Sequence, residues 1–413
     1  MTKLFTNWFK QHKYYLLVNY AKEYHQFNHK LLFPLLITIT LITWKIFNLI
    51  YGKYDYATDL FYKTNSLENK IHIVILFDGD HGLQYLNSLM KSIFYHQNGR
   101  FRCDLKNCCV SNFCDRFNEN FQHNITNLLS PSYTTVFHFL ITTMSSNSAL
   151  IDLMNSWKVH NMEYYFYSCK DHLENLQWIK STHYSGCKPF LKLMLTEILP
   201  THISKVIILD IDMLLNTDII ELWNHFENFN DTQSIGIGLE QNVYFQTVMQ
   251  TLESNWEGYG YNNGVMLFDL SKLRQTSWNK IWISLTRDAL DKQGTLITGE
   301  QDILNLVLFN YKYILYEIPC EWNIQLSEGS DHNRCPVSWL TYSELKKRNF
   351  STLFKQPKLI HINHSRKPND VIWENVSSEH IDQSDTILEQ LDLYTKFISV
   401  YRQYTSLHES CFN

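Results

Sequence analysis

From Lys70 onward, short apolar segments alternate with segments whose apolar residues recur at helical spacing. Strands are predicted at 71–77 (IHIVILF), 136–141 (VFHFLI) and 163–168 (EYYFYS), because these runs are short and rich in β-branched or aromatic residues. Helices are predicted at 82–97 and 148–159, where apolar positions fall every three or four residues. This order predicts an α/β fold with a mainly parallel sheet. We see no repeat and no low-complexity block after the N-terminal segment, so one large domain is expected.

A different apolar pattern lies near the N-terminus. Residues 31–50, LLFPLLITITLITWKIFNLI, provide roughly the 20 mostly apolar residues that a membrane-spanning helix needs. The 30 residues before them carry five lysines and a single acid, Glu23. By the positive-inside rule, this lysine-rich segment stays in the cytosol and the rest of the chain lies in the lumen.

The chain is therefore expected to divide into four parts: a cytosolic tail at 1–30, a transmembrane signal anchor at 31–51, a stem at 52–69 and a lumenal domain at 70–413. A cleaved signal peptide is one alternative, but its apolar run would begin closer to Met1. A buried helix containing Pro34 is the other alternative.

Nine cysteines agree with an oxidising compartment. Four of them crowd a polar insertion at about 98–132, where their spacing fits either disulfides or a zinc site: Cys103, Cys108, Cys109 and Cys114. Cys320 and Cys335 could close the loop between them, but the sequence leaves the pairing open. The Asn-X-Ser/Thr sequons at Asn124, Asn230, Asn349 and Asn375 fit the same compartment.

Composition and charge narrow the class of protein. With 45% hydrophobic and 19% charged residues, the chain is expected to fold into a packed core. The 36 Lys and Arg residues face 41 Asp and Glu residues, and no basic tract could neutralise a run of phosphates. Nucleic acid is therefore not an expected partner.

Two aspartates follow the most apolar run of the domain, in the segment KVIILDIDMLLNTDIIELW at 205–223. VIIL predicts a central strand, and its alternation points Asp210 and Asp212 to the same face at its carboxyl end. Two like charges so close favour a cation between them, and ligands bind at this end of an open α/β sheet. The alternative is that they cap the next helix, but Asp218 with Glu221 already predicts that cap.

The order of several further segments resembles the retaining family 8 glycosyltransferases. These segments are HYSGCKPFLKLMLTEILP, LDID, YNNGVMLFDL, EQDILN, IPCEWNIQLS and HINHSRKP. Within that family they are most similar to the xylosyltransferase domain of the LARGE enzymes, from about residue 70 to about residue 370. The resemblance implies a glycosyltransferase A-type, Rossmann-like fold, a UDP-sugar donor, a glycan or glycoprotein acceptor, and a type II membrane protein of the Golgi. The resemblance is also compatible with a homodimer.

The resemblance further implies a divalent cation, usually manganese (Mn²⁺), held by Asp210, Asp212 and a distant histidine. The matching histidine is His361, and Asp210 would also contact the nucleotide ribose. Two carboxylates and an imidazole form a ligand set that manganese accepts. Lys367, in the same terminal motif as His361, would bind the donor pyrophosphate.

The donor-binding residues implied by the resemblance are Gly79, Lys192, Asp210, Asn262, Gly264, Glu300 and Lys367. Gln301 and Asp302 would surround the anomeric carbon as catalytic residues. Three of these assignments have a structural alternative: Lys192 could lie on the solvated face of an amphipathic helix, Asn-Asn-Gly could be a turn, and Asp302 could cap a helix.

Two departures from the family pattern concern the residues expected to bind the donor. Glu300 stands where the family has aspartate, and Asn363 and His364 replace a glycine that commonly follows the terminal histidine. UDP-xylose is the expected donor, with UDP-glucose or UDP-galactose as alternatives. The chain stops at Asn413 without the second, glucuronyl-adding domain of LARGE, so we do not expect it to polymerise an alternating disaccharide by itself.

The expected reaction retains the configuration of the sugar by same-face attack, guided by the departing phosphate. No second carboxylate is identified in the sequence as a required nucleophile. A catalytically silent glycan-binding relative and a metal-dependent phosphodiester hydrolase are the rival classes. Product analysis with and without a glycan acceptor separates the three.

The predicted topology can be tested with sealed microsomes. Added protease should remove the first 30 residues and spare everything beyond about residue 52, because the membrane shields the lumenal part. Immunoblotting of the protected fragment, with detergent-opened microsomes as the control, measures the outcome. Digestion of the large domain in intact microsomes would contradict the predicted orientation.

Overall fold

The computed structural model describes residues 70–79, 82–97, 101–102, 108, 133–142, 147–339, 355–363, 367–368 and 385–412. All of them belong to one unit, Glu68–Asn413. The predicted tail, anchor and stem lie outside the described residues, as do most of the cysteine-rich insertion and the sequons at Asn124, Asn349 and Asn375. Among the residues that are described, no helix combines the length and apolar character needed to cross a membrane.

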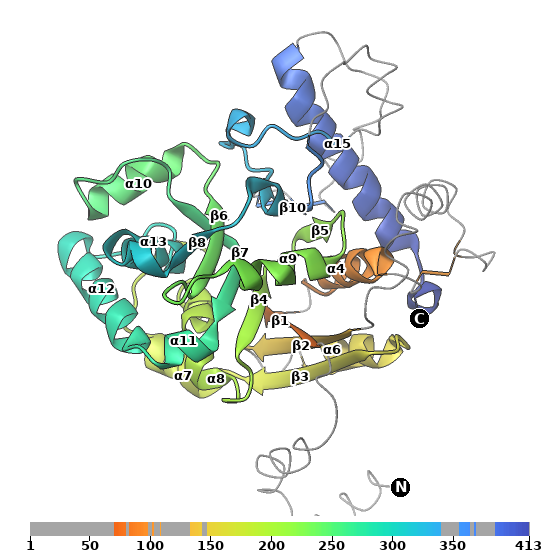
Figure 1. Cartoon of the computed structure of the whole chain (residues 1–413), viewed down its shortest axis with the longest axis horizontal. Coiled ribbons are helices and arrows are strands. Elements are labelled where there is room, and N and C mark those ends of the chain that lie inside the picture. Colours follow the sequence, from red (N-terminus) through yellow and green to blue (C-terminus); the bar gives the residue numbers. More distant parts are fainter. Residues whose placement is uncertain are drawn as a thin grey trace, which may run out of the picture. The chain divides into compact units, whose positions relative to one another are not determined.

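A seven-stranded sheet forms the centre of this unit (Figure 1). Its strands, in spatial order, are β3 (Met162–Ser168), β2 (Thr134–Ile141), β1 (Lys70–Phe77), β4 (Lys205–Leu209), β7 (Tyr261–Asp269), β6 (Ile235–Leu239) and β8 (Leu315–Glu317). All neighbouring pairs are parallel except those of β7, which runs antiparallel to both β4 and β6. The predicted mainly parallel sheet is confirmed. The strands predicted at 71–77, 136–141 and 163–168 are β1, β2 and β3.

Alternation along the central strands divides the core between the two faces of the sheet. On β1, Ile73 and Ile75 pack on one face and Val74 packs on the other. On β4, Ile207 and Val206 divide in the same way. A strand with both faces covered reads as a continuous apolar run, which is why VIIL predicted a central position.

Helices cover both faces (Figure 1). The first face packs against α4 (Leu83–His96) and α15 (Asp385–Ser406), and the second packs against α12 (Trp278–Gln293) and α13 (Glu300–Asn310). Among the described residues, the other α-helices are α6 (Asn147–Ser156), α7 (Lys170–Leu176), α8 (Leu195–Ile198), α9 (Ile219–Trp223), α10 (Tyr244–Leu252) and α11 (Leu270–Arg274). The 3₁₀ helices in the same part of the chain are η5 (Lys188–Met194), η6 (Asn224–Asn228), η7 (Lys312–Ile314), η8 (Cys320–Trp322), η9 (His332–Arg334) and η11 (Glu409–Cys411).

A second, three-stranded sheet adjoins the end of β4. It contains β5 (Met213–Leu215), β10 (Leu359–His361) and β9 (Ile324–Gln325), in the order β5-β10-β9. The strand β10 pairs antiparallel with β5 and parallel with β9. This small sheet therefore brings the C-terminal part of the domain next to the residues that follow β4.

The segment PFLKLMLTEIL is not the single amphipathic helix that its pattern predicted. The chain forms the 3₁₀ helix η5 and then the short helix α8. Every residue from Pro189 to Met194 is buried, Lys192 included. The interpretation of Lys192 as a solvated surface lysine is therefore wrong.

The C-terminal segment is fastened to α4. A disulfide joins Cys108 to Cys411, and Cys320 pairs with Cys335. Lys91, on α4, is 2% exposed. Its ammonium donates to the carbonyl of Leu407 and lies 3.4 Å from a carboxylate oxygen of Glu409. The loop-closing pair at Cys320 is thus found, whereas Cys108 pairs outside its own cysteine-rich cluster.

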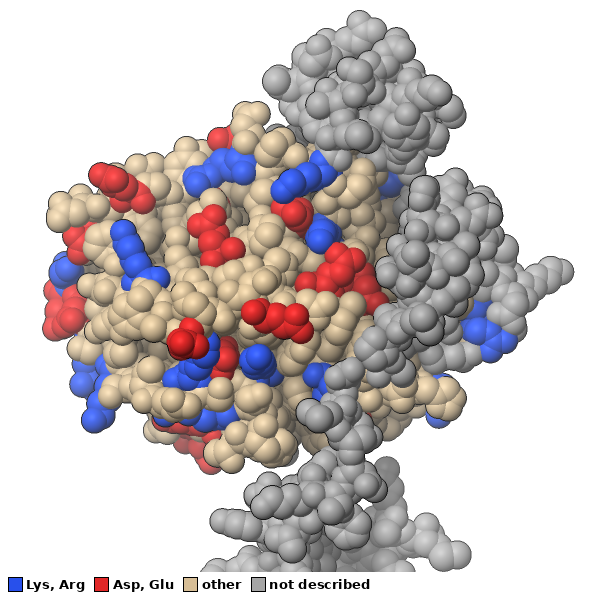
Figure 2. Space-filling model, in the orientation of Figure 1, with Lys and Arg blue, Asp and Glu red and all other residues tan. Residues whose placement is uncertain are grey.

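Charged side chains of both signs lie interspersed on the face of the molecule drawn in Figure 2.

Beneath the surface, two histidines form a neutral pair on β1 and β2. Nδ1 of His72 lies 2.9 Å from Nε2 of His138, and Nδ1 of His138 lies 3.0 Å from the hydroxyl of Tyr167. Burial, aided by Lys70, lowers the pKa of His72 to about 4. Burial and His72 lower the pKa of His138 to about 3.

These shifts predict a loss of stability in mild acid. An unfolded histidine binds a proton below about pH 6.5, whereas the folded pair resists protonation until about pH 4. The pair's contribution is therefore present above pH 6.5 and is lost as the pH falls toward 4. Replacing His138 by Gln, which cannot titrate, should flatten the fall in melting temperature between pH 6.5 and 4.5.

His160, which is exposed, offers the matched control: His160→Gln should keep the wild-type pH dependence of the melting temperature. An equal slope in wild type and in folded His138→Gln would contradict this interpretation of the pair.

Candidate functional site

Asp210 and Asp212 lie on the short connection between β4 and β5. The backbone N–H of Asp210 donates to the carbonyl of Gly264 on β7, at 3.0 Å. The carbonyl of Asp212 accepts from the N–H of Ile362, just after β10, also at 3.0 Å. Each aspartate is thus fixed by a different sheet, and their positions do not depend on a flexible loop.

His361 reaches both aspartates because of the register of the small sheet. It pairs with Met213, the residue directly after Asp212. Its Nε2 lies 3.4 Å from Oδ1 of Asp212 and 3.9 Å from Oδ2 of Asp210. One ligand atom from each of the three residues lies within 4.8 Å of the others. The three predicted metal ligands are therefore brought together, and their donor set fits a divalent cation.

Gly264 provides the space in which the imidazole of His361 lies. A Cβ at this position would stand 2.4 Å from Cε1 and 2.5 Å from Nδ1 of His361, and 2.8 Å from Cε of Met213. The segment YNNG is part of β7, so its interpretation as a turn is wrong. At Gly264, implied by the resemblance to bind the donor, the close neighbour is a side chain of this protein.

Two lysines balance the two carboxylates. Nζ of Lys192 lies 2.7 Å from Oδ1 of Asp210 and 3.5 Å from Oε1 of Glu300, whereas Nζ of Lys367 donates to Oδ2 of Asp212 and to the carbonyl of Ile362. Burial alone would lower the pKa of Lys192, but the two carboxylates outweigh burial and raise it. Burial alone would raise the pKa of Asp212, but Lys367 and His361 hold it well below its ordinary value.

Glu300 opens α13 and faces β7. Its Oε1 accepts from Nδ2 of Asn263 at 2.7 Å, and the side chain is 4% exposed. Burial raises the pKa of Glu300 to about 7, although the Lys192 ammonium acts in the opposite direction. Glu300 thus joins Lys192 and Asp210, both predicted to bind the donor, in one hydrogen-bonded group.

Asn262 and Gln301 meet at a carboxylate that the sequence analysis did not identify, that of Glu240. Nδ2 of Asn262 and Nε2 of Gln301 both donate to Oε2 of Glu240, each at 2.9 Å. Oδ1 of Asn262 accepts from Gly264 and from Nδ2 of Asn323. Glu240 follows the strand β6 as Asp210 follows β4, so the same signal, an acid after an apolar strand, was present at IGIGLEQN.

Asp302 is placed apart from this group. It is fully buried, and its carboxylate accepts from the backbone N–H groups of Ile297 and Thr298 and from the hydroxyl of Thr298. It therefore holds the loop before α13, whose N-cap is Gly299. This geometry gives Asp302 a positioning task, and its contact around the anomeric carbon stays a prediction.

Gly79 lies just beyond the carboxyl end of β1, the neighbour of β4, with φ +80°. The preceding residue, Asp78, accepts from Thr142 and pairs with Lys188. A left-handed φ favours glycine, so backbone shape alone accounts for this residue. The structure puts Gly79 at the predicted edge of the sheet and shows no contact between it and Asp210 or Asp212.

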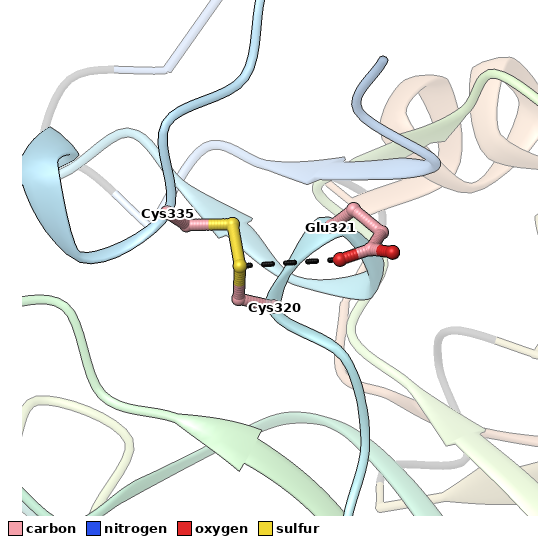
Figure 3. A group of neighbouring side chains, drawn as sticks. All are labelled: Cys320, Glu321 and Cys335. Atoms are coloured by element: carbon pink, nitrogen blue, oxygen red, sulfur yellow. Dashed lines mark hydrogen bonds between the residues drawn. A yellow bond between two sulfur atoms is a disulfide. The ribbon is translucent and has the colours of Figure 1, made fainter. Parts of the chain in front are cut away.

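A second group of potential metal ligands, Cys320, Glu321 and Cys335, is a disulfide with a neighbouring carboxylate (Figure 3). Sγ of Cys320 lies 4.0 Å from Oε2 of Glu321. Metal binding requires thiolates, and both sulfurs are already bonded to each other. This group is therefore structural.

The candidate metal site and the cap of helix α9 can be separated by two matched substitutions. Asp212→Asn removes a charged ligand, so Mn²⁺ affinity should fall by more than the roughly 10–100-fold typical of losing an outer-shell partner. Asp218 instead caps α9, accepting from the N–H of Ile220 at 3.0 Å. Asp218→Asn should keep the wild-type Mn²⁺ response, because asparagine also caps helices.

The measurement is the melting temperature with Mn²⁺ and with chelator, since a ligand that binds only the folded state raises stability. Circular dichroism first shows that each variant is folded. A full Mn²⁺ response in folded Asp212→Asn would contradict the assignment of this residue as a ligand.

Two relatives show where the chain is similar to known enzymes. The xylosyl- and glucuronyltransferase LARGE2s of Gallus gallus is 36% identical over 213 residues, which cover 51% of this chain and 28% of that protein. The xylosyl- and glucuronyltransferase LARGE1 of Homo sapiens is 34% identical over 213 residues, with the same shares. The chain thus matches little more than a quarter of the length of these relatives.

A solved structure supports the fold. The crystal structure of mouse xyloside xylosyltransferase 1, in its apo form, matches 71% of this chain and 98% of its own chain, with a TM-score of 0.50 and 20% identity. At that identity the likeness concerns the fold alone. The family model described as glycosyl transferase family 8 matches residues 44–373. Because this match covers well over half of its residues, the chain belongs to glycosyl transferase family 8.

Proposed function

We propose that the chain is a metal-dependent, retaining glycosyltransferase that moves a sugar from a UDP-sugar to a hydroxyl group of a glycan or glycoprotein. The observation that carries this proposal is the cluster of Asp210, Asp212 and His361 at the carboxyl end of β4, with Lys192 and Lys367 beside it. Family membership and the similarity to xylosyl- and glucuronyltransferases support it.

The cation would be held by Asp210, Asp212 and His361, and manganese suits this mixture of oxygen and nitrogen ligands. When bound, the cation supplies a Lewis acid for the oxygens of the departing diphosphate. Gly264 keeps the imidazole of His361 within reach, since any side chain there would displace it.

The chain's own groups bind and orient the donor. Lys367 places an ammonium beside Asp212, where it can neutralise charge that grows on the pyrophosphate as the bond breaks. The buried ammonium of Lys192 pairs with the carboxylates of Asp210 and Glu300 and keeps them in place. The amides of Asn262 and Gln301 offer hydrogen-bond donors to the sugar.

Retention is proposed to occur by same-face attack. The buried carboxylate of Glu240 already accepts four N–H donors, and that of Asp302 holds the loop before α13. Neither carboxylate is therefore left to attack the anomeric carbon, and a covalent intermediate is not required.

We further propose that the chain works in the Golgi lumen, anchored by the segment 31–51. The disulfides Cys108–Cys411 and Cys320–Cys335 support an oxidising compartment.

The proposed donor is UDP-xylose, which should be turned over faster than UDP-glucose or UDP-galactose. Xylose lacks the exocyclic hydroxymethyl group, so the buried side chains of Glu300 and Asn262 would exclude the larger sugars by contact. Loss of one methylene-sized group in a pocket changes binding by about 1–3 kcal/mol, or roughly 10–200-fold. Competition among the three donors, with Mn²⁺ and product analysis, measures the preference.

Equal turnover of UDP-glucose would contradict the assigned sugar and leave the proposed transferase reaction in place. Absence of transfer from every UDP-sugar by folded wild-type chain, across glycan acceptors, would contradict the proposed reaction.

A further inference from the structure

Glu240 occupies an unusual environment for a carboxylate. It is 3% exposed, and all four of its hydrogen bonds to described residues come from N–H groups. Oε1 accepts from the backbone of Gln241 at 2.9 Å and of Asn242 at 2.8 Å. Oε2 accepts from the side-chain amides of Asn262 and Gln301. The two oxygens therefore have different tasks: one fixes the carboxylate and the other receives two amides.

The backbone brings Glu240 to this position through an irregularity in the sheet. The pairing of β6 with β7 shifts register between Ile237 and Gly238, so that Gly238 faces Asn262. Beyond the shift, the N–H of Glu240 donates to the carbonyl of Gly260 at 2.8 Å. Bulges of this kind re-aim side chains and are common beside active sites.

A carboxylate can only accept hydrogen bonds, and this fixes which way each amide is turned. The nitrogen of Asn262 must face Glu240, which agrees with its Oδ1 accepting from Gly264 and Asn323. The nitrogen of Gln301 must face Glu240 as well, while its Oε1 accepts from the N–H of Asn263 at 3.3 Å. Each amide nitrogen carries a second N–H, for which the described residues offer no acceptor.

We propose that Glu240 is a positioning residue, whose carboxylate orients the amides of Asn262 and Gln301 so that their second N–H groups bind hydroxyls of the donor sugar. This inference rests on the proposed function. It adds a residue, and a way to recognise the sugar part of the donor separately from its nucleotide part.

Glu240→Gln tests the inference because it replaces one carboxylate oxygen, a hydrogen-bond acceptor, by an NH₂ group, a donor, while the side chain keeps nearly the same size. The backbone N–H groups of Gln241 and Asn242 cannot turn, so the oxygen of the new amide must serve them. Its NH₂ then faces the two native amides, donor against donor. Asn262 and Gln301 must either lose this contact or turn, and in both cases the pattern offered to the sugar changes.

The measurement compares the affinities of UDP-xylose and UDP for the purified full-length chain with Mn²⁺, by calorimetry. Glu240→Gln should lower the ratio of UDP-xylose affinity to UDP affinity by about tenfold, the order expected for a lost hydrogen bond in a buried site. Affinity for UDP itself should stay within about twofold, because the amides would contact the sugar and not the nucleotide. A merely structural role for Glu240 would weaken both ligands together.

Asp269→Asn is the matched control. Asp269 is also 3% exposed, but it is the last residue of β7, at the opposite end of that strand from Asn262, where it caps α11 by accepting from the N–H of Lys272. This variant should keep the wild-type affinity ratio. If Glu240→Gln does not fold, Glu240→Asp takes its place; the shorter carboxylate withdraws from one amide and should lower the ratio less.

The outcomes separate the two proposals. If wild-type chain binds UDP and UDP-xylose and the folded Glu240 variants keep its affinity ratio, or lose both affinities in parallel, the role of Glu240 is overturned and the proposed function stands. If wild-type chain binds neither ligand in the presence of Mn²⁺, the proposed function fails and this inference fails with it.

Discussion

The repulsion between the carboxylates of Asp210 and Asp212 is the constraint on which the rest of the site depends. Both aspartates share His361 as a neighbour, and each has its own lysine: Lys192 at 2.7 Å from Asp210, and Lys367 beside Asp212. Lys192 is itself buried, so its charge needs Asp210 and Glu300 as partners. Removing one member of such a group leaves a buried charge without compensation, which costs far more than the group contributes.

The reversed direction of β7 lets one strand serve this site in three ways. Because β7 runs antiparallel to β4, its first residues lie at the carboxyl end of the parallel strands. The carbonyl of Gly264 there fixes Asp210, the missing side chain leaves room for His361, and the amide of Asn262 reaches Glu240. A parallel strand would have presented its other end, where Asp269 caps a helix.

The features predicted from sequence are those that local pattern controls. Apolar runs located β1 to β4, and the two aspartates after VIIL marked the edge of the sheet where the three candidate metal ligands meet. Other features depend on residues distant in the chain: the burial of Lys192, the contact of Gly264 with His361 and the disulfide partner of Cys108. That partner, Cys411, lies 303 positions away. Glu240 was overlooked because the glycines in IGIGL weaken the strand pattern before it. Membership of the family, in contrast, follows from motifs that remain readable without the fold.

The first turns of α13 show how polar side chains fasten this helix to the loop before it and to β7. Asp302 closes the loop before the helix, and Asn305 binds both the N–H and the carbonyl of Tyr261, each at 2.8 Å, which ties α13 to β7. Glu300 spans the space between these two elements, accepting from Asn263 while remaining 3.5 Å from Lys192. Its additional methylene, relative to the aspartate of the family pattern, is therefore taken up between α13 and β7. The departure at Glu300 therefore keeps a carboxyl group at that position, held between Asn263 and Lys192.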